Sequence, residues 1–233
     1  MRMAIDTTFD FRADAGGKDP DSHSPTLRRY HQLLWSKPLP SGDRFDLSDS
    51  TRGIYLHHRS KLGEFFLSSD SVMPTFIRWP ALYPITRQLG DDELQTFFAI
   101  GCTIGGMMVF PGTQIDRKWT INQARGCLRS ISDRFDLTVE CIRRHYAGEP
   151  SPLSETLGRY GDLFGLFGHF RGYVDFFLLG DLVDADLGVR FLMPFDDFRT
   201  SAVPKDVATY REFRQRSMEF IQARNERIGL LRF

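Results

Sequence analysis

The sequence predicts an α+β fold, with a small mixed or antiparallel sheet from the N-terminal half packed on a mainly helical C-terminal half. Short apolar segments separated by turn residues dominate up to residue 112, whereas apolar residues recur at helical spacing after residue 120. The chain has 233 residues, of which 41% are hydrophobic and 26% are charged. Because such a chain can bury its own core, we expect a single domain over residues 1–233.

Residues 1–50 form an irregular segment that we expect to pack on the body of the protein. Gly, Pro, Asp and Ser are dense in this segment and break regular structure. The exception is residues 25–35, where Ser24 and Pro25 supply the N-cap and the first position of a short helix. The aromatic side chains of the segment are expected to anchor it.

Residues 51–112 are expected to hold a hairpin, a helix and a strand. The segments 53–58 and 64–69 are short and apolar, and the turn-like "RSKLG" between them predicts a β-hairpin. An acidic start and a Gly-Gly end predict a helix over 91–104. The run "MMVF" at 107–110 is followed by Pro-Gly, which predicts a buried strand and a turn.

Residues 113–233 are expected to be mainly helical. Thr120 and Gln123 have the three-residue spacing of a capping box, in which each side chain satisfies a backbone donor of the other. Further on, apolar residues at helical spacing predict helices, and the last of these is amphipathic. The predicted segments are helices over 135–146, 152–167, 173–183 and 205–228, and a strand over 189–195.

Phenylalanine is unusually frequent, with 21 copies against 7 Tyr and 3 Trp. Phe buries a large apolar area and has no polar group, so most of these rings should lie in the core. The predicted centre of the core consists of Phe164, Phe167, Phe176, Phe177 and Leu178, with Phe213 and Phe220 packed on them.

Composition also limits the class of protein. The formal net charge is zero, so the chain as a whole has no field that favours nucleic acid or an anionic membrane. No apolar run reaches the roughly 18 residues of a membrane span, and the N-terminus lacks the apolar run of a signal peptide. Three separated cysteines fit a reducing compartment. We therefore predict a cytoplasmic protein with no membrane association.

The motifs of familiar catalytic and cofactor sites are absent from the sequence. It contains no HExxH, no paired-cysteine spacing, no GxSxG and no phosphate-binding loop. We therefore predict no cofactor and no metal centre. The alternative is Mg²⁺, because Asp196, Asp197 and the acidic residues between positions 175 and 186 carry the oxygen ligands that this ion prefers.

The strongest candidate for a functional stretch is basic. Asn122 and Arg125 fall near the start of a predicted helix, where unpaired N–H groups favour an anion. Arg129 is four residues after Arg125, so both should project from one face, and Arg125 has no acidic neighbour at helical spacing. Together with Lys118 they predict a cleft around residues 118–129 that binds, and as a further step processes, a phosphorylated ligand such as a nucleotide or nucleic acid. Turn chemistry is the structural alternative.

Other charged residues nearby are given different roles. Arg134 follows Asp133 at a helix start and needs a carboxylate there, so it should be structural. Arg143 and Arg144 lie at a helix end, where the dipole favours cations, and should be structural as well. If the cleft performs chemistry, the candidate acids and bases are Asp133, Asp175 and His169.

Charge distribution supports a competing hypothesis, a non-enzymatic interaction protein. Residues 148–200 hold four basic and nine acidic side chains, a net charge of −5. Residues 114–147 hold seven basic and four acidic, and residues 205–233 also hold seven and four, so each has a net charge of +3. The blocks either neutralise one another within the fold or join copies of the chain, for example in a homodimer.

Several stretches together resemble a known family. They include "TINQARG", "DRFDLTVECIRRHY", "FRGYVDFFLLGDLV" and "YREFRQRSMEFIQARNERI". Over nearly its whole length the chain resembles an uncharacterised bacterial family of unknown function. This resemblance implies a bacterial source and a single unit of this length, and it implies no activity, ligand or catalytic residue.

Overall fold

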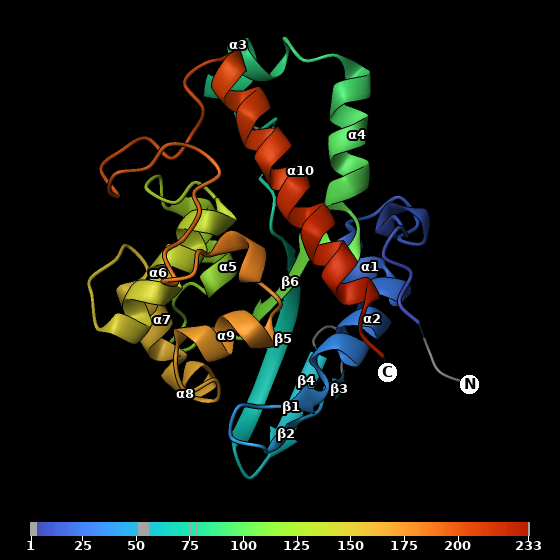
Figure 1. Ribbon diagram of the computed structural model, residues 1–233, viewed down its shortest axis with the longest axis vertical. Helices are drawn as coiled ribbons and strands as arrows, with labels where there is room; N and C mark the ends of the chain where they lie inside the picture. Colours follow the sequence, from blue (N-terminus) through green and yellow to red (C-terminus); the bar gives the residue numbers. More distant parts are fainter. Residues whose placement is uncertain (1–3, 51–55, 75, 78, 233) are drawn as a thin grey trace.

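The computed structural model shows an α+β architecture around one small sheet (Figure 1). It describes residues 4–50, 56–74, 76–77 and 79–232. Helices α5 to α9 lie on one side of the sheet in Figure 1, and α1, α2 and α4 lie on the other. The long C-terminal helix α10 runs beside α4 and ends near the N-terminal segment.

The sheet is antiparallel throughout, with its four strands in the order β3-β4-β5-β6. Strands β4 and β5 form the predicted hairpin, in which Leu56 pairs with Leu67 and Ser60 with Gly63. The start of this prediction, residues 53–55, lies outside the described residues. The strands of the sheet are β3 (Ser48–Asp49), β4 (Leu56–Ser60), β5 (Gly63–Ser71) and β6 (Met107–Pro111), and a separate pair is β1 (Lys37–Pro38) with β2 (Arg44–Phe45).

The helices alternate with the strands early in the chain and then follow one another. The N-terminal ones are α1 (Pro20–His23), α2 (Pro25–Trp35), α3 (Tyr83–Thr86) and α4 (Asp91–Gly101). The C-terminal ones are α5 (Ile121–Cys127), α6 (Phe135–Ala147), α7 (Ser154–Arg159), α8 (Gly161–Gly165), α9 (Phe170–Phe176) and α10 (Val207–Gly229). Short 3-10 helices are η1 (Phe11–Ala13), η2 (Pro80–Leu82), η3 (Ile104–Gly106) and η4 (Gly180–Leu182).

Capping residues explain why several helices begin where they do. The Ser24 hydroxyl accepts a hydrogen bond from the Leu27 N–H at 3.0 Å, which starts α2 as predicted. The predicted capping box is confirmed in α5, where Thr120 and Gln123 satisfy each other's backbone N–H groups. Each capping side chain accepts a hydrogen bond from a backbone N–H that would otherwise be unpaired. Because capping residues have a characteristic spacing, these helix starts could be predicted from the sequence.

Two predicted elements in the C-terminal half are wrong. The segment 173–183 is not one helix, because α9 ends at Phe176 and Leu178 adopts a left-handed φ of 57°. The segment 189–195 is not a strand beyond an isolated bridge between Val183 and Val189. Its backbone is held instead by the carboxylate of Asp136, which accepts a hydrogen bond from the Leu192 N–H at 2.9 Å.

The predicted helix over 152–167 is also divided. It consists of the short helices α7 and α8, which are separated at Tyr160. Tyr160 ends α7 in a non-helical conformation, and its hydroxyl donates a hydrogen bond to the Thr113 carbonyl at 2.9 Å. This side-chain contact with a distant loop explains why the apolar spacing alone did not reveal the break.

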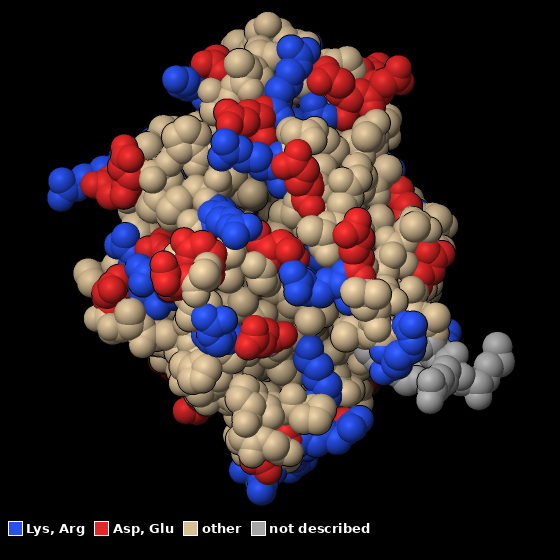
Figure 2. Space-filling model, in the orientation of Figure 1, with Lys and Arg blue, Asp and Glu red and all other residues tan. Residues whose placement is uncertain are grey.

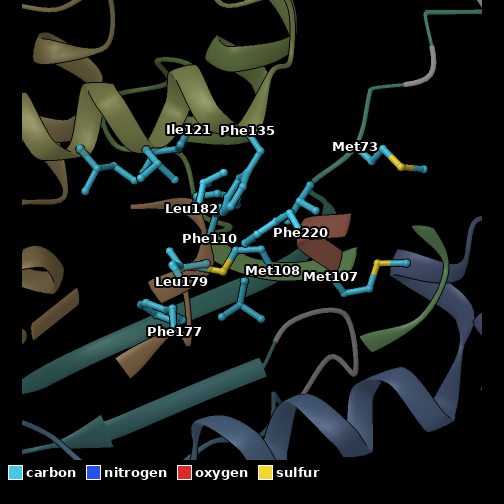
Figure 3. Packing of buried hydrophobic residues seen from close by; sticks show 14 of the residues in the cluster. Met73, Met107, Met108, Phe110, Ile121, Phe135, Phe177, Leu179, Leu182 and Phe220 are labelled. Carbon is cyan, nitrogen blue, oxygen red and sulfur yellow. The ribbon is translucent and has the colours of Figure 1, made fainter. Parts of the chain in front are cut away.

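One hydrophobic cluster includes buried residues from Ile5 to Ile228, and Figure 3 shows part of it. Phe164, Phe167, Phe176 and Phe177 are buried as predicted, and the rings of Phe167 and Phe176 lie 4.9 Å apart. Leu178 is only partly buried. Two further predicted partners pack elsewhere, because the ring of Phe213 contacts Phe76 at 5.5 Å and that of Phe220 contacts Phe135 at 6.2 Å.

Candidate functional site

A cavity of about 410 Å³ opens between α1, the end of β5, residues 73–74, 76–77 and 79, the end of α4 and the loop before α6. One part of its wall is apolar and another part carries carboxylates. The main apolar residues are Met73, Phe76, Trp79 and Phe98, and the polar ones are Asp19, Asp21, Ser71, Asp133 and the thiol residue Cys102. A volume of this size fits a small organic ligand.

Helix α1 places Asp21 at the cavity. Asp19 is the N-cap of this helix and Pro20 its first residue, so the turn that carries Asp21 is fixed locally. The Asp14 carboxylate then accepts hydrogen bonds from the Ser24 hydroxyl at 2.5 Å and from the Thr26 N–H at 3.1 Å. These contacts hold the junction between α1 and α2 against the strand β5.

The polar side chains at the end of β5 make contacts on both faces of the sheet. Successive side chains of a strand point to opposite faces. Ser69 therefore reaches α1 and α2, where it lies 3.2 Å from the Asp21 carboxylate. Asp70 points the other way, toward α5, where its carboxylate lies 2.7 Å from Arg125. The run "SSDS" that ends the strand thus connects two groups of charged residues.

Arg125 is fully buried, which corrects the expectation that it projects from α5 with no acidic neighbour. Its guanidinium binds Asp70 at 2.7 Å and lies 3.3 Å from the Asp133 carboxylate. It also donates to the carbonyl oxygens of Asp133 at 2.8 Å and Ser71 at 3.2 Å. These partners come from distant segments, so helical spacing could not reveal them. Arg125 fixes the carboxylates around the cavity.

Asp133 reaches the cavity through a strained turn. Ser132 and Asp133 both have left-handed backbones, with φ of 49° and 63°. Two successive non-glycine residues in this region are energetically unfavourable, and such strain often lies at functional sites. The Asp133 N–H donates to the Arg125 carbonyl at 2.8 Å, which holds the turn in place.

Two carboxyl groups, that of Asp21 at the cavity and that of Asp70 beside it, have pKa values raised toward neutral pH. Burial raises the pKa of Asp21 to about 7, and the nearby charges of Asp70 and Asp19 add to this effect. Burial also raises the pKa of Asp70, to about 6, although Arg125 opposes the shift. Carboxyl groups of this kind can exchange protons under physiological conditions, which is a common property of functional sites.

The four predicted ligand-binding residues do not converge. Lys118 is exposed and binds the Glu155 carboxylate at 2.6 Å. Asn122 faces the strand β5, where its Nδ2 lies 3.4 Å from the Ser68 hydroxyl, and its buried Oδ1 has no hydrogen-bond partner among the described residues. Arg129 is exposed and Arg125 is buried, so they do not share one surface. In the part of the chain that the structure describes, these four side chains therefore do not share one surface, although Lys118 lines an open pocket of its own.

The candidate acids and bases also lie apart. His169 caps α9, where its Nδ1 accepts a hydrogen bond from the Gly172 N–H at 3.0 Å. Asp175 is exposed on the same helix. Of these three residues, only Asp133 lines the cavity of about 410 Å³ described above, which we call the carboxylate cavity. His169 lines a different, open pocket together with Arg143 and Arg171.

Arg134, Arg143 and Arg144 form ion pairs with carboxylates, and for Arg134 this partner was predicted. Arg134 is fully buried and its Nε lies 3.1 Å from the Asp136 carboxylate. Arg143 and Arg144 both bind Glu140, at 2.8 Å and 2.7 Å. These contacts stabilise the start and the end of α6.

The acidic and basic blocks meet within the chain. Lys118 binds Glu155, and Arg227 binds Asp181 at 2.8 Å, so the acidic block contacts both basic blocks. Figure 2 shows positive and negative side chains interspersed on the face that contains α10.

Among the described residues, no group of three or more His, Cys, Asp or Glu side chains is placed to hold a metal ion. Nor does any described helix combine the length and apolar character needed to cross a membrane.

Comparison with known proteins identifies a family. A model of a family of unknown function (DUF6994) matches residues 5–228. The chain belongs to this family. The resemblance over nearly the whole chain is therefore confirmed. No curated protein and no solved structure matches the chain.

Sequence reasoning missed most residues of the cavity. Asp21 lies in a turn-rich stretch, and Asp70 closes a hairpin strand, so each has an ordinary local explanation. The available signal was the polar end of an otherwise apolar strand, since Asp70 and Ser71 continue β5 beyond the predicted end at residue 69. Such an extension indicates that side chains from elsewhere satisfy these groups.

Proposed function

We propose that this protein binds a small organic amine, an apolar group that carries an ammonium, in the carboxylate cavity. The observation that supports this function is the division of the cavity wall. Asp19, Asp21 and Asp133 supply hydrogen-bond acceptors and negative charge, and Phe76 and Trp79 supply aromatic surface. An ammonium donates hydrogen bonds and has no acceptor, so it complements the carboxylates.

Electrostatics favours a cation over an anion. Among the described residues that line the cavity, none is Lys or Arg. The buried cation Arg125 is occupied by Asp70 and Asp133. Burial and the repulsion by Asp70 and Asp19 raise the pKa of Asp21, and the positive charge of a bound ammonium would offset both effects. A phosphorylated ligand would meet like charges here.

The apolar wall supports an organic rather than an inorganic cation. Phe76, Trp79 and Phe98 lie on this wall, and ring faces attract ammonium groups as well as apolar carbon. Phe76 is held in a left-handed conformation with φ of 59°. Backbone strain of this kind is often found at ligand-binding sites.

Calorimetric titration with phenethylamine tests this proposal. Wild-type protein should bind this amine and should not bind phenylacetate, which has the same ring and the opposite charge. Asp21→Asn should weaken binding about 10- to 100-fold, because it replaces a charge-assisted hydrogen bond. The matched control is Asp175→Asn, which makes the same change on an exposed helix face. Equal affinity for the amine and the acid, or no binding of either, would refute the proposal.

A second candidate function is the binding of a nucleotide or another phosphorylated ligand at a different pocket. Trp119 is 49% exposed and lines an open pocket of about 430 Å³ with Arg117, Lys118 and Arg159. An exposed ring among cations can stack on a base while the cations bind phosphate. Titration with adenosine monophosphate tests this function, and Trp119→Ala should abolish binding without changing the affinity for phenethylamine.

A further inference from the structure

A chain of hydrogen bonds leads from the core to the carboxylate of Asp21. The Trp35 indole Nε1 lies 3.0 Å from the Nδ1 of His31. The Nε2 of His31 lies 3.0 Å from the Ser69 hydroxyl, which in turn lies 3.2 Å from Asp21 Oδ1. Trp35 and His31 are both buried, so these contacts are shielded from water.

Only one direction of donation is consistent with this chain. The indole N–H of Trp35 is a donor and never an acceptor, so the Nδ1 of His31 must accept. Burial lowers the pKa of His31 to about 3, with Arg224 and Arg28 adding to the effect, so the imidazole is neutral and carries its proton on Nε2. His31 therefore donates to Ser69, and Ser69 donates to Oδ1 of Asp21.

The direction of these hydrogen bonds excludes a role for Ser69 as a nucleophile and indicates a role in positioning Asp21. A neutral His31 with its proton on Nε2 cannot accept the proton of Ser69, so Ser69 is not an activated nucleophile. The chain instead fixes Oδ1 of Asp21 as an acceptor. Oδ2 remains as the oxygen of Asp21 that can hold a proton or bind a ligand.

We propose that Asp21 loses a proton when an amine enters the cavity, and that Ser69, His31 and Trp35 are positioning residues for this exchange. The inference rests on the amine-binding function proposed above. The ammonium keeps its own protons and forms an ion pair with the new carboxylate, while the proton of Asp21 leaves to the solvent. The charged or titratable groups around Asp21 are Asp19, Asp70, Asp133, Arg125, His31, Arg28 and Cys102.

Loss of the Ser69 hydroxyl should shift this exchange. A hydrogen bond to the ionised carboxylate favours ionisation, and Ser69 lowers the pKa of Asp21 in this way. Ser69→Ala should therefore raise the pH at which the proton is released. Ser69→Thr keeps the hydroxyl and should restore the wild-type pH dependence. A purely structural role for Ser69 would instead weaken binding equally at every pH.

Calorimetry in two buffers with different ionisation enthalpies counts the protons released when phenethylamine binds. We expect the wild type to release about half a proton near pH 7, more near pH 6 and almost none near pH 8.5. Asp21→Asn should release none, and the Ser69→Ala profile should move to higher pH. Binding without proton release, or unchanged release in Asp21→Asn, would overturn the inference and leave amine binding intact. Absence of binding by the wild type would overturn both.

Discussion

Replacement of Arg125 by Ala should destabilise the protein strongly. The sequence alone favours the opposite outcome, in which this change abolishes ligand binding with little loss of stability. The structure reverses the expectation, because the guanidinium is fully buried and contacts residues of β5, α6 and the loop between α5 and α6. Its removal leaves the Asp70 carboxylate beside Asp133 without a compensating charge.

The ion pairs of Arg125 determine how much stability the substitution should cost. Removal of one partner from a buried ion pair costs about 3–5 kcal/mol. The lower end applies here, because the Asp70 side chain is 25% exposed and water can partly replace the guanidinium. We therefore expect Arg125→Ala to cost about 3 kcal/mol, which corresponds to a decrease in melting temperature of roughly 6–12 °C for a chain of this length.

The cost should also depend on pH. Without Arg125 the pKa of Asp70 rises further above its present value of about 6, because the guanidinium is the main effect that lowers it. Protonation then neutralises the unpaired carboxyl, so Arg125→Ala should be less destabilising near pH 5 than near pH 8. Asp70→Asn in the same protein should reduce the cost at the higher pH, as a double-mutant cycle would show.

Urea unfolding followed by tryptophan fluorescence measures these differences. Arg129→Ala is the matched control, since Arg129 is exposed on the turn after α5 and should change stability by less than about 0.5 kcal/mol. A cost below about 1 kcal/mol for Arg125→Ala at both pH values would refute the structural role assigned to this residue.

Three further predictions concern the core and the cavity. Phe177→Ala should cost about 3–5 kcal/mol in chemical unfolding, and a cost below 1 kcal/mol would contradict its burial. Arg224→Met should cost about 3 kcal/mol by thermal unfolding, because the buried Arg224 donates to the carbonyls of Gly105, Met107 and Phe177. The pKa of Asp21 is raised from 3.8 to about 7, so the stability it contributes is present at low pH and lost as the pH rises through 7. Relative to the wild type, Asp21→Asn should therefore gain stability as the pH rises from about 4 to 8, and urea midpoints with the same pH dependence in both proteins would contradict this.

Local chemistry allowed much of the fold to be predicted from the sequence. The caps at Ser24 and Thr120 fixed the starts of α2 and α5, and the turn between β4 and β5 fixed the hairpin. The long helix α10 followed from its amphipathic spacing. In each case the residues that decide the structure lie within a few positions of one another.

The site could not be predicted, because its residues meet only in the folded chain. Arg125 looked unpaired because Asp70 is 55 positions away and Asp133 is eight positions away, beyond the three- or four-residue spacing of a helix. Asp21 gained its raised pKa from burial and from a neighbour on another element. The end of α9 was missed for a similar reason, because an apolar run does not show where Leu178 turns left-handed.

Crystallography with 4-bromophenethylamine tests the central claim most directly. The bromine gives an anomalous peak that locates the ring without reference to the protein. We predict a peak beside Phe76, Trp79 and Phe98, with the ammonium within hydrogen-bond distance of Asp21. A peak elsewhere, such as beside Trp119, or a ligand whose ammonium points away from the carboxylates, would contradict the assignment of this cavity as an amine site.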